Sequence, residues 1–469
     1  MGKRVQAAQT SDSQDHTAES GHHPATCRRP AGRKPGPAPQ YETFGQQLIA
    51  LVRHCFPEMN QWLDALPDPR RLELCTYEGR HIWWQIVLTF LLRGGSRNAF
   101  DGDRNTGQLP ANVLQLCEQV WNEERLGTRR TVTCSGNAVY HAARVAVSAV
   151  ADIPVKMVRR LMKMRLLDSG RLFDRWWLIA VDGTLQDRGH DTKEGEARHR
   201  YVLAASLIGP CGMTFPLMSE FMDMHDPVRD KDDCEINAFG RLAKRLRAKF
   251  PRLPICLLMD GLYAAQTVFD TCDVYGWKFI STLREGRQPL AYDEAVQTMT
   301  MSPSLLSFGQ RDGEDGTVEQ TLRWTDNVPF GKHDLQVLFS GEISPTTATL
   351  WVWVTNLELN HDRVYDIANH GGRARNSIEN LFNVEKNGGF GLEHTFCANT
   401  QASQNFHLML QVAFILWQLL AKGVLHRLTQ TCRKVTDVKL VELLHTSLLS
   451  VLVHPDARTF GQLRLCSSA

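Results

Sequence analysis

The spacing of apolar residues divides the chain into a helical first part and a mixed second part. Between residues 41 and 174, segments such as FGQQLIALVRHCF and IWWQIVLTFLL place apolar residues at intervals that give a helix one buried face. From residue 175 onward, short apolar runs alternate with helical patterns, which predicts an α/β domain. Residues 1–40 are rich in Pro, Ser, Thr, Gln and His, so we predict a disordered tail there.

Two of the short apolar runs predict buried strands that end at an acidic residue. Leu178 to Val181 is followed by Asp182, and Ile255 to Met259 is followed by Asp260. Asp-Gly closes each run and predicts that the strand stops at a turn. Such a strand carries its last side chain to the edge of an open α/β sheet, where ligands collect. Most aspartates in this position only cap a turn, so neither residue is diagnostic by itself.

Other patterns complete the second part of the chain. Tyr201 to Phe221 contains two apolar segments separated by Gly-Pro-Cys-Gly, which predicts a hairpin. From about Glu285 to Thr349, short β-prone runs alternate with Gly, Pro and Asp, which predicts a mostly β insertion. The approximate extent of this insertion is 285–349. The final residues, 423–469, predict a C-terminal helical segment.

The stretch from Arg375 to Lys386 contains no Gly or Pro and predicts a helix. At about 100° per residue, Arg375, Glu379 and Lys386 fall within a stripe of about 40°, beside an apolar face that contains Ile378. One flank is therefore predicted to be buried while the other presents a carboxylate between two cations. The simpler alternative is a surface ion pair between Arg375 and Glu379, which stabilises a helix by only about 0.3 to 0.5 kcal/mol.

Taken together, these segments resemble the bacterial insertion-sequence DDE transposases. The spacing Arg-x3-Glu-x6-Lys in RARNSIENLFNVEK looks like the signature of that family, and AVDGT and LLMDGLYA resemble its two aspartate motifs. The resemblance implies a ribonuclease H-like (retroviral-integrase-like) catalytic core over residues 175–422 with a β-rich insertion. It also implies that the all-α region 41–174 comes first and binds transposon ends.

The resemblance implies a two-metal mechanism. Asp182 would bridge two Mg²⁺ or Mn²⁺ ions, Asp260 would hold one of them and Glu379 the other, because hard cations prefer carboxylate oxygens. Two such ions stabilise the entering and the leaving oxygen of a phosphodiester displacement. Arg375 and Lys386 would bind DNA phosphates. Asn380 and Tyr263 are secondary candidates, since packing or capping explains them equally well.

One position departs from the family signature. A tyrosine often stands three residues before the arginine, and that position is Gly372 here. In relatives that excise through a DNA hairpin, the resemblance implies a role for this tyrosine near the terminal phosphate. Hairpin and hydrolytic excision therefore both remain open.

Composition limits the choice of partner and compartment. The chain has 469 residues, a formal net charge of +2 and a pI near 8.0, so any DNA contact requires local basic patches. Residues 156–165 (KMVRRLMKMR) are one candidate, and a solvent-facing basic helix is the equal alternative. Twelve scattered cysteines without a Cys-x2-Cys pair, together with the absence of a secretory or membrane-spanning pattern, predict a cytoplasmic, nucleoid-associated protein. The expected partners are double-stranded DNA (transposon ends and target) and a second copy in a synaptic homodimer.

Other functions fit parts of this pattern. A catalytically silent, transposase-derived DNA-binding protein would keep the fold, yet it should lose at least one of Asp182, Asp260 and Glu379. A structure-specific nuclease of the same fold would keep all three. An unrelated metal-dependent hydrolase for small substrates would show no salt-sensitive DNA affinity.

Overall fold

The structure, a computed structural model, describes residues 43–190, 197–222, 234–302, 304–313, 315–425 and 435–454. These residues form a mixed α/β protein around a nine-stranded, mostly antiparallel sheet. The predicted tail, residues 1–40, lies outside the described residues, as do parts of the predicted segment 423–469.

The first part of the chain is helical, as predicted. Every regular element between Phe44 and Lys163 is a helix, and most have one buried apolar face. The elements are α1 (Phe44–Cys55), α2 (Met59–Asp64), η2 (Leu72–Leu74), α3 (Gly79–Leu91), α4 (Arg97–Asp103), α5 (Leu109–Leu116), α6 (Glu123–Leu126), α7 (Ser135–Ala142), α8 (Val147–Val150) and α9 (Asp152–Lys163), followed by the short turn η3 (Asp168–Gly170).

The sheet has the strand order β3-β2-β1-β4-β5-β9-β8-β7-β6. Only the pairs β1/β4 and β4/β5 are parallel. The strands are β1 (Trp177–His190), β2 (Ala197–Ile208), β3 (Thr214–Met222), β4 (Ile255–Met259), β5 (Lys278–Thr282), β6 (Leu306–Gly313), β7 (Gly316–Phe330), β8 (His333–Ile343) and β9 (Ala348–Thr355).

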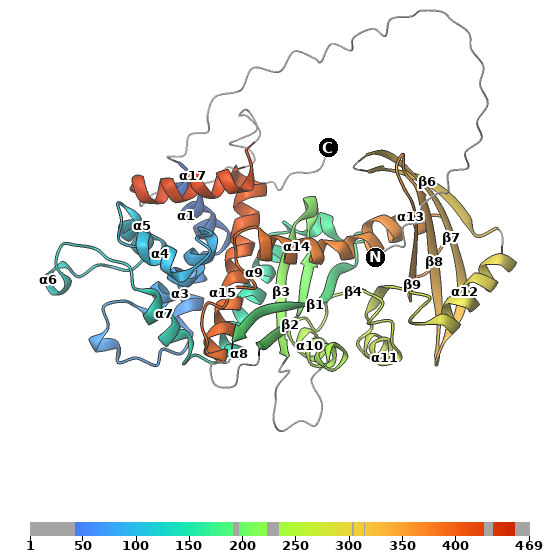
Figure 1. Ribbon diagram of the computed structural model, residues 1–469, viewed down its shortest axis with the longest axis horizontal. Coiled ribbons are helices and arrows are strands. Elements are labelled where there is room, and N and C mark those ends of the chain that lie inside the picture. Colours follow the sequence, from blue (N-terminus) through green and yellow to red (C-terminus); the bar gives the residue numbers. More distant parts are fainter. Residues whose placement is uncertain are drawn as a thin grey trace, which may run out of the picture.

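Helices and short helical turns connect and cover these strands. They are η4 (Pro210–Gly212), α10 (Glu235–Lys249), α11 (Gln266–Tyr275), α12 (Pro289–Met301), α13 (Val364–Asp366), the π-helix η5 (Ile367–Gly371), η6 (Gly372–Arg375), α14 (Asn376–Asn387), α15 (Thr400–Gln418), the π-helix η7 (Leu419–Leu425) and α17 (Asp437–Ser450). In Figure 1, α14 crosses above the central strands, and α10 and α11 lie below them. The helical part of the chain lies on one side of these strands and β6–β9 on the other.

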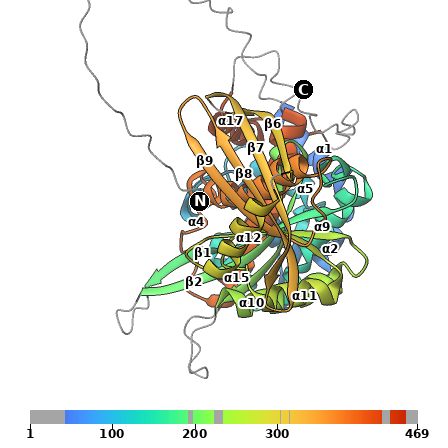
Figure 2. The same ribbon diagram turned by 90° about the vertical axis from the view of Figure 1, so that its right-hand side faces the viewer.

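The predicted β insertion extends the same sheet. Strands β6, β7 and β8 continue it beyond β9, and Figure 2 shows this part of the sheet facing the viewer. Along β7, buried and exposed residues alternate because successive side chains of a strand point to opposite faces. The insertion also contains α12, which the sequence pattern did not predict. Pro289 begins this helix, in the first turn, where the missing N–H costs nothing.

The β1 prediction was wrong in one respect. The strand does not stop at Asp182-Gly183 but continues to His190, because β2 pairs with it on the far side along this whole length. The prediction for β4 is confirmed, since it ends at Met259 and Asp260 begins a turn. Asp182 therefore lies inside a strand while Asp260 follows one.

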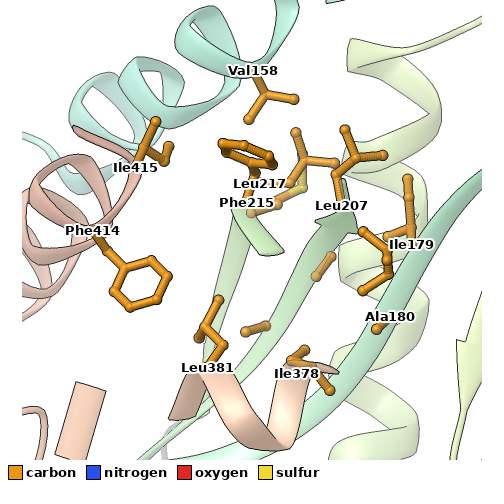
Figure 3. Packing of buried hydrophobic residues seen from close by; sticks show 14 of the residues in the cluster. Val158, Ile179, Ala180, Leu207, Phe215, Leu217, Ile378, Leu381, Phe414 and Ile415 are labelled. Atoms are coloured by element: carbon orange, nitrogen blue, oxygen red, sulfur yellow. The ribbon is translucent and has the colours of Figure 1, made fainter. Parts of the chain in front are cut away.

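The core joins α14 to the sheet and to the first part of the chain. Ile378 and Leu381 of α14 are buried, and Figure 3 shows them beside residues of the central strands, including Ile179 and Leu207. Phe414 and Ile415 of α15 and Val158 of α9 complete the same cluster. Burial of this face fixes which side of α14 remains available to the solvent.

The apolar helix at the centre of the molecule is a core helix. Among the described residues, Thr400–Gly423 alone is long and apolar enough to cross a membrane, and 89% of its most apolar window is buried inside the protein. It packs against α3, α7 and β3. Most of this helix is therefore packed inside the protein.

Glu385 is an acidic residue buried in this core. Burial raises the pKa of its carboxyl from 4.5 to about 8, although Gln411 donates a hydrogen bond to it and Lys386 is nearby. Its Oε2 atom has no hydrogen-bond partner, which fits a protonated carboxyl group. Because the folded state holds this proton more tightly than the unfolded state, stability falls as the pH rises from about 4.5 through about 8.

We predict that Glu385→Gln stabilises the protein at neutral pH. The neutral amide removes the cost of ionising a buried group, so the free energy of unfolding should rise by about 3 kcal/mol at pH 7 and remain unchanged near pH 4. Urea unfolding at both pH values measures this difference. The exposed Glu319→Gln should change neither value, and an equal effect of Glu385→Gln at both pH values would contradict the assignment.

Candidate active site

Asp182 and Asp260 lie at the same level on neighbouring parallel strands. Strand β1 pairs with β4 from Trp177 to Ala180, with Ala180 opposite Leu258. Continuing this register by two residues brings Asp182 level with Asp260. Strand β4 ends just before Asp260, so from Asp182 onward β1 has no paired strand on the side of β4. The two carboxyl groups therefore lie at the carboxyl end of the parallel pair, where open sheets bind ligands.

Helix α14 brings Glu379 to the same place through Arg375. The Arg375 guanidinium donates from Nη2 to Asp182 Oδ2 at 2.9 Å and from Nη1 to Glu379 Oε1 at 2.5 Å. The Arg375 side chain is 9% exposed, whereas that of Glu379 is 45% exposed. Arg375 thus connects two acidic residues that lie 193 positions and four positions away in the sequence. The simpler alternative, a surface ion pair within one helix, accounts only for the bond between Arg375 and Glu379.

Asp260 faces a different arginine. Arg284 Nη2 lies 3.8 Å from Asp260 Oδ2. The other oxygen of Asp260, Oδ1, accepts a hydrogen bond from the backbone N–H of Leu262 at 2.8 Å, which holds the carboxylate at the start of its turn. In the described parts of the chain, no group of three or more His, Cys, Asp or Glu side chains is arranged to hold a metal ion. At Asp182 and Glu379, the positive charge is supplied by Arg375 instead.

The electrostatic setting of Asp182 is unfavourable for a negative charge. Burial raises the pKa of its carboxyl to about 6, and the nearby guanidinium of Arg375 opposes this rise. The negative charges of Asp260, Glu379 and Glu235 raise the pKa further. Each of these acids is thus close enough to act on Asp182 electrostatically.

Glu235 is an acidic residue at the site that the sequence patterns did not single out. It begins α10, and its Oε2 accepts a hydrogen bond at 2.6 Å from the hydroxyl of Tyr263, which is buried. Its Oε1 lies 2.5 Å from the point that a Cβ atom on Gly183 would occupy. Gly183 therefore makes room for the carboxylate of Glu235 instead of forming the predicted turn.

Of the remaining predicted site residues, Lys386 and Asn380 lie apart from this cluster and Tyr263 lies within it. Lys386 forms an ion pair with Glu393 at 2.9 Å, so it does not contact the three acids. Asn380 lines a cavity of about 450 Å³ between α14, α15 and α17. Tyr263, the other secondary candidate, is within the site and is bonded to Glu235. The three residues predicted to share one stripe are therefore separated. Arg375 and Glu379 lie at the site, and Lys386 does not.

The departure at Gly372 has a steric reason. A Cβ atom on Gly372 would lie 2.4 Å from Cε2 of Trp353 in β9, and one on Gly371 would lie 2.4 Å from Cδ1 of Ile280 in β5. The chain thus passes directly over the sheet before it enters α14. No side chain fits at position 372 while Trp353 occupies this space.

A buried ion-pair network fixes the segment that precedes α14. Glu342 of β8 is 5% exposed, and both of its oxygens accept bonds from Arg373. Arg311 Nη2 and Gln320 Nε2 donate to the same carboxylate at 2.9 and 2.8 Å. Gln320 also exchanges two hydrogen bonds with Asn369 in the π-helix η5, at 3.0 and 2.9 Å. The extended part of the sheet thus holds the chain two residues before Arg375.

The basic segment 156–165 is largely engaged with other side chains. Arg160 lies 3.5 Å from Glu58, and Arg165 lies 2.9 Å from Asp168. The Arg159 guanidinium lies 4.9 Å from the ring centre of Phe250. Arg159, Lys163 and Arg165 are nevertheless exposed, so both interpretations of the segment stay predictions.

Comparison with known proteins adds no family assignment. No protein-family model matches the sequence, and a search of curated proteins finds no match.

We predict that Gly372→Ala destabilises the protein by about 2 kcal/mol, because the added methyl group overlaps Trp353 in a packed region. Thermal or urea unfolding measures the loss. Gly240 of α10 is a matched control, since a Cβ atom there meets nothing within 4 Å. Gly240→Ala should stabilise the helix by about 0.5 to 1 kcal/mol. A neutral Gly372→Ala would show that the approach to Trp353 is not tight.

A second prediction concerns Glu342. Glu342→Gln should lower the free energy of unfolding by about 3 kcal/mol, because the arginines at positions 311 and 373 lose the buried charge that compensates them. Glu358→Gln removes an exposed partner of Arg363 and should cost less than about 0.5 kcal/mol. Urea unfolding compares the two variants, and equal losses would contradict a special role for the buried network.

Proposed function

We propose that this protein is a DDE-type DNA transposase with a ribonuclease H-like catalytic core. In this proposal it binds transposon ends and catalyses DNA strand cleavage and strand transfer. The observation that carries the proposal is the pair of bonds from Arg375 to Asp182 and Glu379, with Asp260 directly after the neighbouring strand. The three acids that the sequence pattern selected thus gather around the end of one parallel strand pair.

The residues present suit a pair of divalent cations. The donors are carboxylates, which are the ligands that Mg²⁺ and Mn²⁺ prefer. Burial raises the pKa of Asp182, and the negative charges of Asp260, Glu379 and Glu235 add to this rise, which a bound cation would oppose. Asp182, Asp260 and Glu379 would hold the ions, which when bound supply positive charge to the reacting phosphate.

The side chains have separable roles in the proposed reaction. Asp182 lies in the sheet and Asp260 directly follows β4, whereas Glu379 approaches from a helix and is more exposed. Arg375 offers a planar pair of donors that matches a phosphate group. Because Gly372 replaces the signature tyrosine and no side chain fits there, hydrolytic excision is the route that this chain's residues favour over a hairpin.

The remaining parts of the proposal concern partners. We propose that the helical region 41–174 recognises transposon ends in double-stranded DNA and that two copies act together in a synaptic homodimer in the cytoplasm. A catalytically silent relative would have no use for two carboxylates held by one buried arginine with a third acid nearby. A nuclease of the same fold remains the closest alternative, because it needs the same carboxylates.

We predict that Asp182→Asn, Asp260→Asn and Glu379→Gln each lower the rate of DNA cleavage by at least about a thousandfold and leave DNA binding largely intact. Each substitution removes one negative charge of the proposed metal site and preserves side-chain volume. Asp293→Asn, on the exposed side of α12, is the control and should retain full activity. Cleavage assays with Mg²⁺ or Mn²⁺ and band-shift assays measure the two properties. Retained cleavage in any of the three variants would contradict the proposal.

A strand-transfer assay separates a transposase from a nuclease. The protein is given DNA with a pre-cut 3′-hydroxyl end from the flanks of its own gene, a target plasmid and Mn²⁺. Joined products support a transposase, whereas nicked products alone indicate a nuclease.

A further inference from the structure

Every acidic residue of the proposed metal site faces an arginine. Arg375 bonds to Asp182 and Glu379, and Arg284 lies 3.8 Å from Asp260. These contacts differ in closeness, because the Arg375 side chain is 9% exposed and that of Arg284 is 42% exposed. Arg375 is therefore the principal positive charge inside the site.

We propose that Arg375 and a divalent cation compete for the same carboxylate oxygens, so that Arg375 leaves Asp182 and Glu379 when the cation binds. This inference rests on the proposed function, since it takes these carboxylates as metal ligands. It assigns Arg375 two successive partners, first the acids of the site and then a phosphate of the DNA.

The geometry supports competition rather than shared occupancy. The guanidinium uses Nη1 for Oε1 of Glu379 and Nη2 for Oδ2 of Asp182, so it lies between the two carboxylates. A cation held by both residues needs oxygens of the same two groups. A guanidinium and a divalent cation also repel each other strongly at such short separations in a partly buried site. With Arg375 in this position, no described group of acids is arranged to hold a metal ion.

Once released from the two acids, Arg375 would be able to bind another group. Its Nε atom is buried without a hydrogen-bond partner, so the guanidinium is not fully satisfied where it lies. After release, its donors can form a two-point contact with a phosphate group, which Arg favours over Lys. Metal binding would then both complete the site and free a phosphate-binding side chain.

If Arg375 competes with the cation, removing its positive charge should strengthen metal binding. We expect Arg375→Ala to bind Mn²⁺ about tenfold more tightly than the unaltered chain, since one pair of charge-assisted bonds no longer opposes the ion. Isothermal titration of the full chain with Mn²⁺ alone, without DNA and at mildly alkaline pH, measures this affinity. DNA cleavage by the same variant should fall, because the phosphate contact is lost.

Lys386→Ala is the matched control for a general effect of charge. Lys386 carries the same charge near the other end of α14 and pairs with Glu393. Its removal should change Mn²⁺ affinity by about twofold or less, since charges at a distance are screened by salt. An equal gain in both variants would overturn the inference, because simple electrostatics would then explain it.

The outcomes distinguish this inference from the proposed function. If Mn²⁺ binds the unaltered chain and Arg375→Ala binds it no more tightly, competition is disproved and the metal site stands. If neither protein binds Mn²⁺, the proposed function fails as well.

A measurement on the unaltered chain avoids any effect of substitution on folding. Phenylglyoxal modifies accessible guanidinium groups, and the modified peptides are identified by mass spectrometry. Arg375 should be protected without metal and become several-fold more reactive with saturating Mn²⁺, whereas Arg363 on the surface should react equally in both states. Unchanged protection of Arg375 in the metal-bound protein would overturn the inference.

Discussion

The arrangement of the site depends on how negative charge is balanced where β1 passes the end of β4. The negative charges of Asp260, Glu379 and Glu235 act there on Asp182, which is partly buried. Buried carboxylates repel one another and resist ionisation unless a cation is close. Arg375 provides that cation through bonds to two of the four acids. Its placement is therefore a requirement for this group of acids to coexist.

The rest of the fold determines where Arg375 can lie. The two glycines before it pass over Trp353 and Ile280, which fixes the height of the chain above the sheet. The network around Glu342 holds Arg373, two residues earlier, from the extended part of the sheet. The apolar face of α14 then sets the direction in which Glu379 points. The added strands β6–β8 thus contribute to the geometry of the site although they lie outside it.

The sequence predicted the helices and strands better than it predicted how they pair and pack against one another. Periodicity and β-prone runs identified α14, β4 and the β2–β3 hairpin, because these signals are local. The continuation of β1 through Asp182 depends on pairing with β2, which no local pattern records. Glu235 reaches the site only because α10 packs against β2 and β3, so its position at a helix start carries no chemical signature. Gly372 is explained by Trp353, a contact between distant segments.

Keeping the carboxyl group of Asp182 ionised costs folding free energy, and this cost helps to distinguish an enzyme from a catalytically silent DNA-binding protein. Burial, together with three nearby acids, raises the pKa of Asp182 to about 6, which means that keeping it ionised at neutral pH consumes folding free energy. Buried ion pairs are often no more stabilising than apolar groups of similar size. A protein that only binds DNA through exposed cations gains nothing from such a site. Charge crowding of this kind is expected where a carboxylate must bind a cation or a reacting group, which favours the catalytic interpretation.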